Sequence, residues 1–136
     1  MLNDHFGLTL SAVMALAVGL PALSAQAKGE STYKAVCASC HASGAANAPR
    51  VGDQKKWAVL IREGQARITA DGYVGIRGMP AKGGKPDLSL EDFADAVVYM
   101  ANQSGGKWAS PDANLLAAIQ QEIAKREKTL ASKTKK

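Results

Sequence analysis

Apolar residues recur at the spacing of an α-helix in several segments of the chain. One such stripe, formed by Trp57, Leu60 and Ile61, lies between a potential N-cap at Asp53 and a helix-ending Gly64. We find no segment with the alternation of apolar and polar residues that a half-buried strand requires. The pattern therefore predicts an all-α protein. Its expected helices cover residues 30–37, 54–63, 66–73 and 89–102, followed by a last helix that begins near residue 110.

Local signals mark the expected starts of three of these helices. Ser31 can cap the first helix, which leads into a pair of cysteines. Ser89 followed by Asp92 resembles a capping box, with Asp in place of the usual Glu or Gln. Ser110 followed by Pro111 predicts a cap and a proline at the first helical position of the last helix.

Residues 1–27 have the features of a secretory signal sequence. Residues 6–20 are almost entirely apolar, and Ala25-Gln26-Ala27 forms a small-residue cleavage site. We therefore expect the mature chain to begin at Lys28 and to lie in the periplasm. The residues before the apolar stretch contain no Lys or Arg, and the stretch nearly reaches membrane-spanning length. An uncleaved N-terminal membrane anchor is therefore the alternative.

The most specific motif of the chain is Cys37-Ala38-Ser39-Cys40-His41. Two cysteines separated by two residues and followed directly by histidine are typical of covalent haem attachment. Each thiol can add to one vinyl group of the haem, and the adjacent imidazole can reach the iron as the proximal ligand. Both cysteines of the chain lie in this motif, so none is left for a structural disulfide. The sequence predicts one haem c attached through Cys37 and Cys40.

Loss of the signal sequence narrows the search for the second iron ligand. It would remove one of the two histidines and two of the four methionines, namely His5, Met1 and Met14. A second histidine is then absent, and the remaining sulfur ligands are Met79 and Met100.

Met79 and Met100 lie in different contexts. Met79 stands between Gly78 and Pro80 in a loop over residues 75–86, where a sulfur atom can be presented to the iron. Met100 lies on the apolar face of a predicted helix, where core packing is the expected role of a methionine. We therefore predict Met79 as the ligand. Ligation by His and Met leaves no open iron position, which favours electron transfer over catalysis.

Three further segments add to the haem attachment motif at residues 37–41: 48–53 (APRVGD), 56–57 (KW) and 78–84 (GMPAKGG). With them, residues 33–101 resemble the bacterial class I cytochromes c, and most closely the cytochrome c5 family. The resemblance implies short helices wrapped around one haem with an exposed edge, with His41 and Met79 as axial ligands. It also implies that the Pro49 carbonyl accepts a hydrogen bond from Nδ1–H of the proximal histidine. The first helix is expected to pack across the helix over 89–102. Ala81 departs from the family, which often has a second proline there.

Trp57 has two interpretations. Its indole N–H can bind a haem propionate, or the side chain can simply belong to the core. Arg50 can likewise pair with a propionate or remain solvated in its loop.

The expected organisation is a signal sequence (1–27), a cytochrome c domain (28–106) and a C-terminal helix with a basic tail (107–136). The resemblance does not explain the last segment. The formal net charge of +5 is largely a property of this tail, where Glu127 is the one acid among six basic residues from Lys125 to Lys136. The tail is either a solvated end or a docking element for an acidic redox partner or an anionic membrane. Nucleic-acid binding is not expected, because aromatic residues do not interleave the charges.

The predicted function is a periplasmic, monomeric electron carrier that serves a redox protein donor and acceptor. One alternative is a peroxidase-like enzyme with a labile Met79, although a distal histidine would be lacking after export. A second is a CxxC thiol–disulfide protein, which would require a βαβ context. A zinc site is a poorer interpretation, since three clustered ligands lack a fourth.

Overall fold

The computed structural model describes residues 21–135, with side chains from residue 26 onward. This part of the chain is helical and contains no strand beyond one isolated antiparallel bridge between Ile76 and Met79. The predicted all-α fold is confirmed. In chain order the elements are α1 (Pro21–Thr32), η1 (Tyr33–Cys37), α2 (Ala38–His41), η2 (Ala45–Asn47), α3 (Gln54–Glu63), α4 (Gln65–Val74), η3 (Ala81–Gly84), α5 (Leu90–Gln103) and α6 (Ala113–Thr134).

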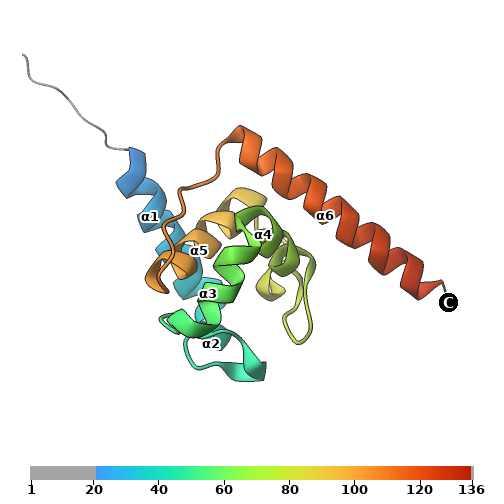
Figure 1. Cartoon of the computed structure of the whole chain (residues 1–136), viewed down its shortest axis with the longest axis horizontal. Coiled ribbons are helices and arrows are strands. Elements are labelled where there is room, and N and C mark those ends of the chain that lie inside the picture. The colour runs from blue at the N-terminus through green and yellow to red at the C-terminus, as the bar shows by residue number, and fades with distance from the viewer. Residues whose placement is uncertain (1–20, 136) are drawn as a thin grey trace, which may run out of the picture.

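Helices α1 and α5 cross in close contact (Figure 1). Gly29 lies at the crossing and is buried, and a Cβ atom built on it would collide with the carbonyl group of Asp95. Beside the crossing, Lys28 forms an ion pair with Asp92 at 2.7 Å. The expected packing of the first helix across the helix over 89–102 is therefore present.

The first helix is longer than its sequence signals indicated. It already includes Pro21, the first described residue, and Ser31 lies inside the helix and does not cap it. Packing on α5 offsets the low helix propensity of Gly29. A π-helical turn, η1, then carries the chain into α2 without a break. The helix spans the predicted cleavage point after residue 27. Most of the predicted signal sequence, with Met1, His5 and Met14, lies outside the described residues.

The predicted caps of the two middle helices are confirmed. The Asp53 carboxylate accepts a hydrogen bond from the Lys56 N–H at 3.1 Å, and the Ser89 hydroxyl accepts one from the Asp92 N–H at 3.1 Å. The capping box is only half formed, because the Asp92 carboxylate pairs with Lys28. Helix α4 also matches the expected helix over 66–73 to within one residue at each end.

The start predicted for the last helix was wrong by a few residues. Helix α6 begins at Ala113, and its N-cap is Asp112, whose carboxylate accepts from the Leu115 N–H at 2.8 Å. Ser110 and Pro111 precede the helix, because the carboxylate two residues later supplies the better-placed acceptor. In Figure 1, α6 lies along α4 and its far end projects beyond the rest of the protein. Between residues 21 and 135 no helix is both long and apolar enough to span a membrane.

Candidate functional site

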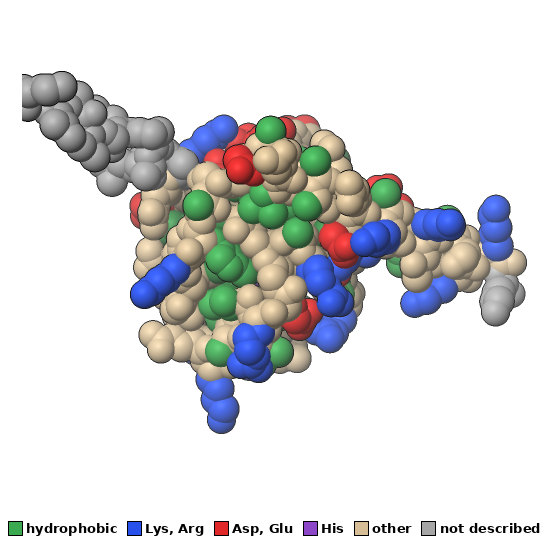
Figure 2. All heavy atoms as spheres, turned by 45° about the horizontal axis from the view of Figure 1, so that its top comes forward, with side chains coloured by type: hydrophobic (Ala, Val, Ile, Leu, Met, Phe, Trp, Pro, Cys, Tyr) green, Lys and Arg blue, Asp and Glu red, His purple; other side chains and the backbone are tan. Residues whose placement is uncertain are grey.

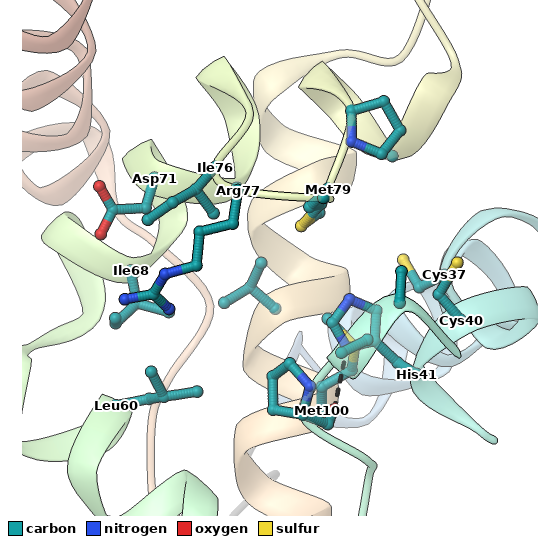
Figure 3. A pocket seen from close by; sticks show the side chains of 18 of the residues that line it. Cys37, Cys40, His41, Leu60, Ile68, Asp71, Ile76, Arg77, Met79 and Met100 are labelled. Carbon is teal, nitrogen blue, oxygen red and sulfur yellow. Dashed lines mark hydrogen bonds between the residues drawn. The ribbon is translucent and has the colours of Figure 1, made fainter. Parts of the chain in front are cut away.

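A cavity of about 310 Å³ lies between α2, α3, α4, α5 and the loop that carries Met79 (Figure 3). Its walls are mainly apolar and include Leu60, Ile68, Ile76, Phe93 and Val97. All the site residues predicted from the sequence line this one cavity: Cys37, Cys40, His41, Pro49, Trp57 and Met79. Residues that are far apart in the sequence are thus brought together.

His41 lies on the short helix α2 and is 6% exposed. Its Nδ1 atom is 2.9 Å from the carbonyl oxygen of Pro49. A carbonyl can only accept, so Nδ1 is the protonated nitrogen and Nε2 keeps its lone pair for the cavity. The Val51 N–H donates to the His41 carbonyl at 2.8 Å and holds the returning chain against α2. The backbone therefore fixes both the tautomer and the orientation of the imidazole.

Cys37 and Cys40 lie one helical turn apart beside His41, and neither forms a disulfide (Figure 3). Burial raises the pKa of the Cys37 thiol to about 11. This thiol is therefore neutral at pH 7, whereas a dithiol redox catalyst requires a thiol of lowered pKa. The described residues also lack the βαβ unit of such proteins. Both observations disfavour the thiol–disulfide alternative.

The two candidate methionines differ in structure as they do in sequence. Met79 is partly buried in the loop after α4, where its backbone exchanges hydrogen bonds with Ile76 at 2.9 and 3.1 Å. Figure 3 shows its side chain directed into the cavity that His41 also faces. Met100 belongs to α5, is 3% exposed and is part of the core, as expected.

Trp57 is 2% exposed and forms part of the cavity wall. Its indole N–H donates to the carbonyl oxygen of Arg50 at 2.9 Å. Because the N–H already has a partner within the protein, the geometry favours the core interpretation over a propionate bond. The Arg50 backbone, and not its exposed side chain, makes this contact.

Gly72 is a site residue that we did not identify from the sequence. A Cβ atom at this position in α4 would lie 2.9 Å from Cζ of Phe93 and 3.4 Å from Cε of Met79. The missing side chain thus leaves space for the Phe93 ring, and the methyl group of Met79 lies at van der Waals distance from the same position. A glycine inside a predicted helix was the available signal, since glycine is unfavourable there without a packing reason.

This donor set fits a covalently bound haem. It combines two thiols one turn apart, an imidazole with its free nitrogen toward the cavity, a thioether and apolar walls. A zinc site has no support in the described part of the chain, where no three side chains of His, Cys, Asp or Glu are placed so that they could hold a metal ion together.

Several known proteins are similar to this chain in sequence and fold. Residues 24–100 match the family described as cytochrome c oxidase, cbb3-type, subunit III. Cytochrome c-555 of Chlorobaculum thiosulfatiphilum is 46% identical over 82 residues, which cover 57% of this chain and 95% of the relative. Cytochrome c-555 of Chlorobaculum tepidum is 44% identical, with 57% and 76% covered. Cytochrome c5 of Azotobacter vinelandii is 31% identical, with 54% and 90% covered. The expected likeness to cytochrome c5 is present, but the c-555 proteins are more similar.

A solved structure agrees with these relatives. One chain from the crystal structure of an electron transfer complex of nitrite reductase with cytochrome c matches with a TM-score of 0.55 and 36% identity. The match covers 57% of this chain and 94% of that chain. The sequence, the fold and the cavity agree, and the chain therefore belongs to the class I cytochromes c, electron carriers with a single covalently attached haem c.

Proposed function

We propose that this cytochrome is an exported electron carrier whose haem iron is held by His41 on one side and by Met79 on the other. One observation carries the proposal. The oriented imidazole of His41 and the thioether of Met79 face the same cavity, which the two attachment cysteines also line. Met100 borders this cavity too, but it lies on α5 within the hydrophobic core, so we assign its sulfur to core packing and not to the iron.

The arrangement suits one-electron transfer. When bound, the haem supplies an iron centre that cycles between two oxidation states. Protein ligands on both sides of the iron do not need to enter or leave during this cycle. The hydrogen bond from Nδ1 to Pro49 makes Nε2 of His41 a stronger ligand. The thioether of Met79 raises the reduction potential relative to a second imidazole.

The same features argue against peroxidase-like chemistry. That reaction would require Met79 to leave the iron and a nearby group to transfer protons. Asp71 lines the cavity, but its carboxylate forms an ion pair with Arg126. A sulfur ligand on the iron and an engaged Asp71 carboxylate therefore disfavour this alternative. The other acid of the cavity wall, Glu63, is an exposed residue at the end of α3.

We propose a redox protein as donor and another as acceptor. The related chain found in a nitrite reductase complex supports a partner of this kind.

Export is proposed from the signal sequence. Cleavage after Ala27 would leave Lys28 and Gly29, which both contact α5, in the mature protein. Sequencing of the N-terminus of protein from the periplasm is expected to give Lys28, and a chain that retains residues 1–27 would contradict export by cleavage.

Two methionine variants test the ligand assignment. The oxidised wild-type holoprotein is expected to show the charge-transfer band of a Met–Fe(III) bond, and Met79→Ala to lose it. Met100→Leu is the matched control, since it removes the other sulfur near the cavity while keeping an apolar side chain of similar volume. The assignment is wrong if Met79→Ala keeps the band or if Met100→Leu loses it. Acid–organic extraction should leave the haem on every variant.

A further inference from the structure

Helix α6 lies outside residues 24–100, which the family match covers, and it contributes no side chain to the cavity wall. It nevertheless packs closely on a helix that does form this wall. Ile119 is fully buried and Ile123 is 9% exposed, and both belong to one apolar cluster with Ala70 of α4 and Ala94 of α5. Loss of α6 would expose this side of α4 to water.

Three charged side chains, Arg126, Asp71 and Glu122, lie at the end of the contact between α4 and α6, and we call them the polar clamp. The Arg126 guanidinium forms ion pairs with Asp71 of α4 and with Glu122 of its own helix, the latter at 2.7 Å. The Arg126 and Asp71 side chains are only 19% and 24% exposed, so water screens this pair less than it screens a pair on the surface. Arg126 also donates to the Arg67 carbonyl at 3.4 Å. Beyond the clamp, residues 127–135 are exposed, and Figure 2 shows Lys and Arg side chains along this projecting end.

The other side of α4 forms the part of the cavity wall on which Met79 packs. Ile68, Asp71 and Gly72 line the cavity, and the Met79 methyl group lies 3.4 Å from the position of a Cβ atom at Gly72, so Met79 packs directly on this part of α4. In Figure 3 the Asp71 carboxylate points away from the cavity centre, toward the side on which α6 lies. Asp71 is thus the residue of α4 that belongs to both the cavity wall and the clamp.

The end of α4 also holds the loop that carries Met79. The Tyr73 ring meets the Phe93 ring edge-on at 5.4 Å, and the Lys82 ammonium group lies 4.9 Å from the centre of the Tyr73 ring. At Gly75, just after the helix, a Cβ atom would lie 2.9 Å from the Ala81 nitrogen and 3.2 Å from the Met79 carbonyl oxygen. A displacement of α4 would therefore be transmitted directly to this loop.

We propose that α6 is a brace that keeps Met79 at the iron by holding α4 in place, with Arg126 as a positioning residue that acts through Asp71. The inference rests on Met79 being an iron ligand. Without the clamp, α4 gains freedom to move away from the cavity, and the bond between iron and sulfur competes less well with ligands from solution. Helix α6 thus helps to keep other ligands off the iron, although it contributes no side chain to the cavity wall.

Imidazole affinity of the oxidised, full-length holoprotein tests the brace, because added imidazole binds iron only where Met79 has left it. Arg126→Gln and Ile119→Ala are expected to raise this affinity about tenfold, which corresponds to about 1.4 kcal/mol. Arg126→Lys should recover part of the wild-type behaviour, since it restores the charge but not the planar fork. The Met–Fe(III) band should weaken in parallel.

Two controls separate the brace from a general loss of stability. Lys128→Ala changes an exposed residue of α6 beyond the clamp, and Lys28→Ala breaks a different interhelical ion pair, between α1 and α5. Both should keep the wild-type imidazole affinity. If Arg126→Gln and Ile119→Ala also keep it while the band is intact, the brace is wrong and Met79 ligation stands. If the wild-type protein lacks the band and Met79→Ala changes nothing, the proposed ligation fails and the brace with it.

Discussion

The indole N–H of Trp57 donates to the carbonyl oxygen of Arg50, the residue that directly follows Pro49. The Pro49 carbonyl in turn accepts from Nδ1 of His41. Two consecutive carbonyl groups of one loop are thus held by two side chains of the haem cavity. Trp57 thereby fixes the loop segment that orients the proximal imidazole.

Trp57→Phe is expected to destabilise the protein without a large change in its reduction potential. The substitution keeps an aromatic ring in the cavity wall but removes one of the two hydrogen bonds to the Arg50 carbonyl, which also accepts from the Asp53 N–H at 3.1 Å. Loss of one such bond costs about 0.5–1.5 kcal/mol. Denaturant unfolding of the holoprotein measures the loss, and a redox titration measures the potential. The opposite outcome, a large shift in potential with unchanged stability, would favour a bond between the indole and a haem propionate.

Gly29→Ala is expected to lower the free energy of unfolding, although alanine is the better helix former. The new methyl group would meet the backbone of α5 at the helix crossing, and overpacking of this kind costs about 1–3 kcal/mol. The gain in helix propensity is only about 1 kcal/mol. Ala35→Ser, at an exposed position of the same helical stretch, should change stability by less than about 0.5 kcal/mol. A stabilised Gly29→Ala protein would show that the two helices do not touch there.

Gly72→Ala should loosen the bond between Met79 and the iron. The added methyl group would lie 2.9 Å from Cζ of Phe93, so this ring would have to shift, and the Met79 methyl group, in van der Waals contact with the same position at 3.4 Å, would have to adjust to the new arrangement. The Met–Fe(III) band is expected to weaken, and cyanide should bind the oxidised protein more tightly than it binds the wild type. Arg67→Ala, an exposed change on the same helix, is the control. Wild-type spectra and cyanide affinity in Gly72→Ala would contradict the proposed packing of Met79 on α4.

The clamp on α6 makes stability depend on pH in the acid range. Hydrogen bonds from Arg126 and Lys125 lower the pKa of Glu122 from 4.5 to about 2. A carboxyl group with a lower pKa in the folded state stabilises that state above its unfolded pKa and loses this contribution as pH falls. The melting temperature should therefore fall between about pH 5 and pH 2, and by less in Glu122→Gln. Identical pH profiles for the two proteins would contradict this assignment, and Glu127→Gln should follow the wild type.

Much of the fold and of the site could be predicted from local chemistry. The caps at Asp53 and Ser89 depend on side chains next to the helix they begin, so the sequence contains the whole signal. The attachment motif and the loop position of Met79 similarly depend on short stretches, whereas the role of the Pro49 carbonyl was implied by the resemblance to the class I cytochromes c. The structure places all of these residues at one cavity.

The features that were missed depend on contacts between distant residues. The helical conformation of the residues just before position 30 reflects packing of Gly29 on α5, and the partner of the Trp57 indole is a backbone carbonyl, which no residue type reveals. The role of Gly72 follows only from the positions of Phe93 and Met79. The link from Arg126 to Asp71 crosses 55 positions in sequence, beyond any local pattern.

An optical redox titration of the purified holoprotein is the decisive measurement for a single covalent haem c held between His41 and Met79. We expect one one-electron step, with a Met–Fe(III) band that is present in the oxidised protein and disappears on reduction. Because a thioether ligand raises the reduction potential, Met79→His should titrate at a clearly lower potential. An oxidised protein without the band, or a Met79→His variant with the wild-type potential, would contradict the His41/Met79 pair.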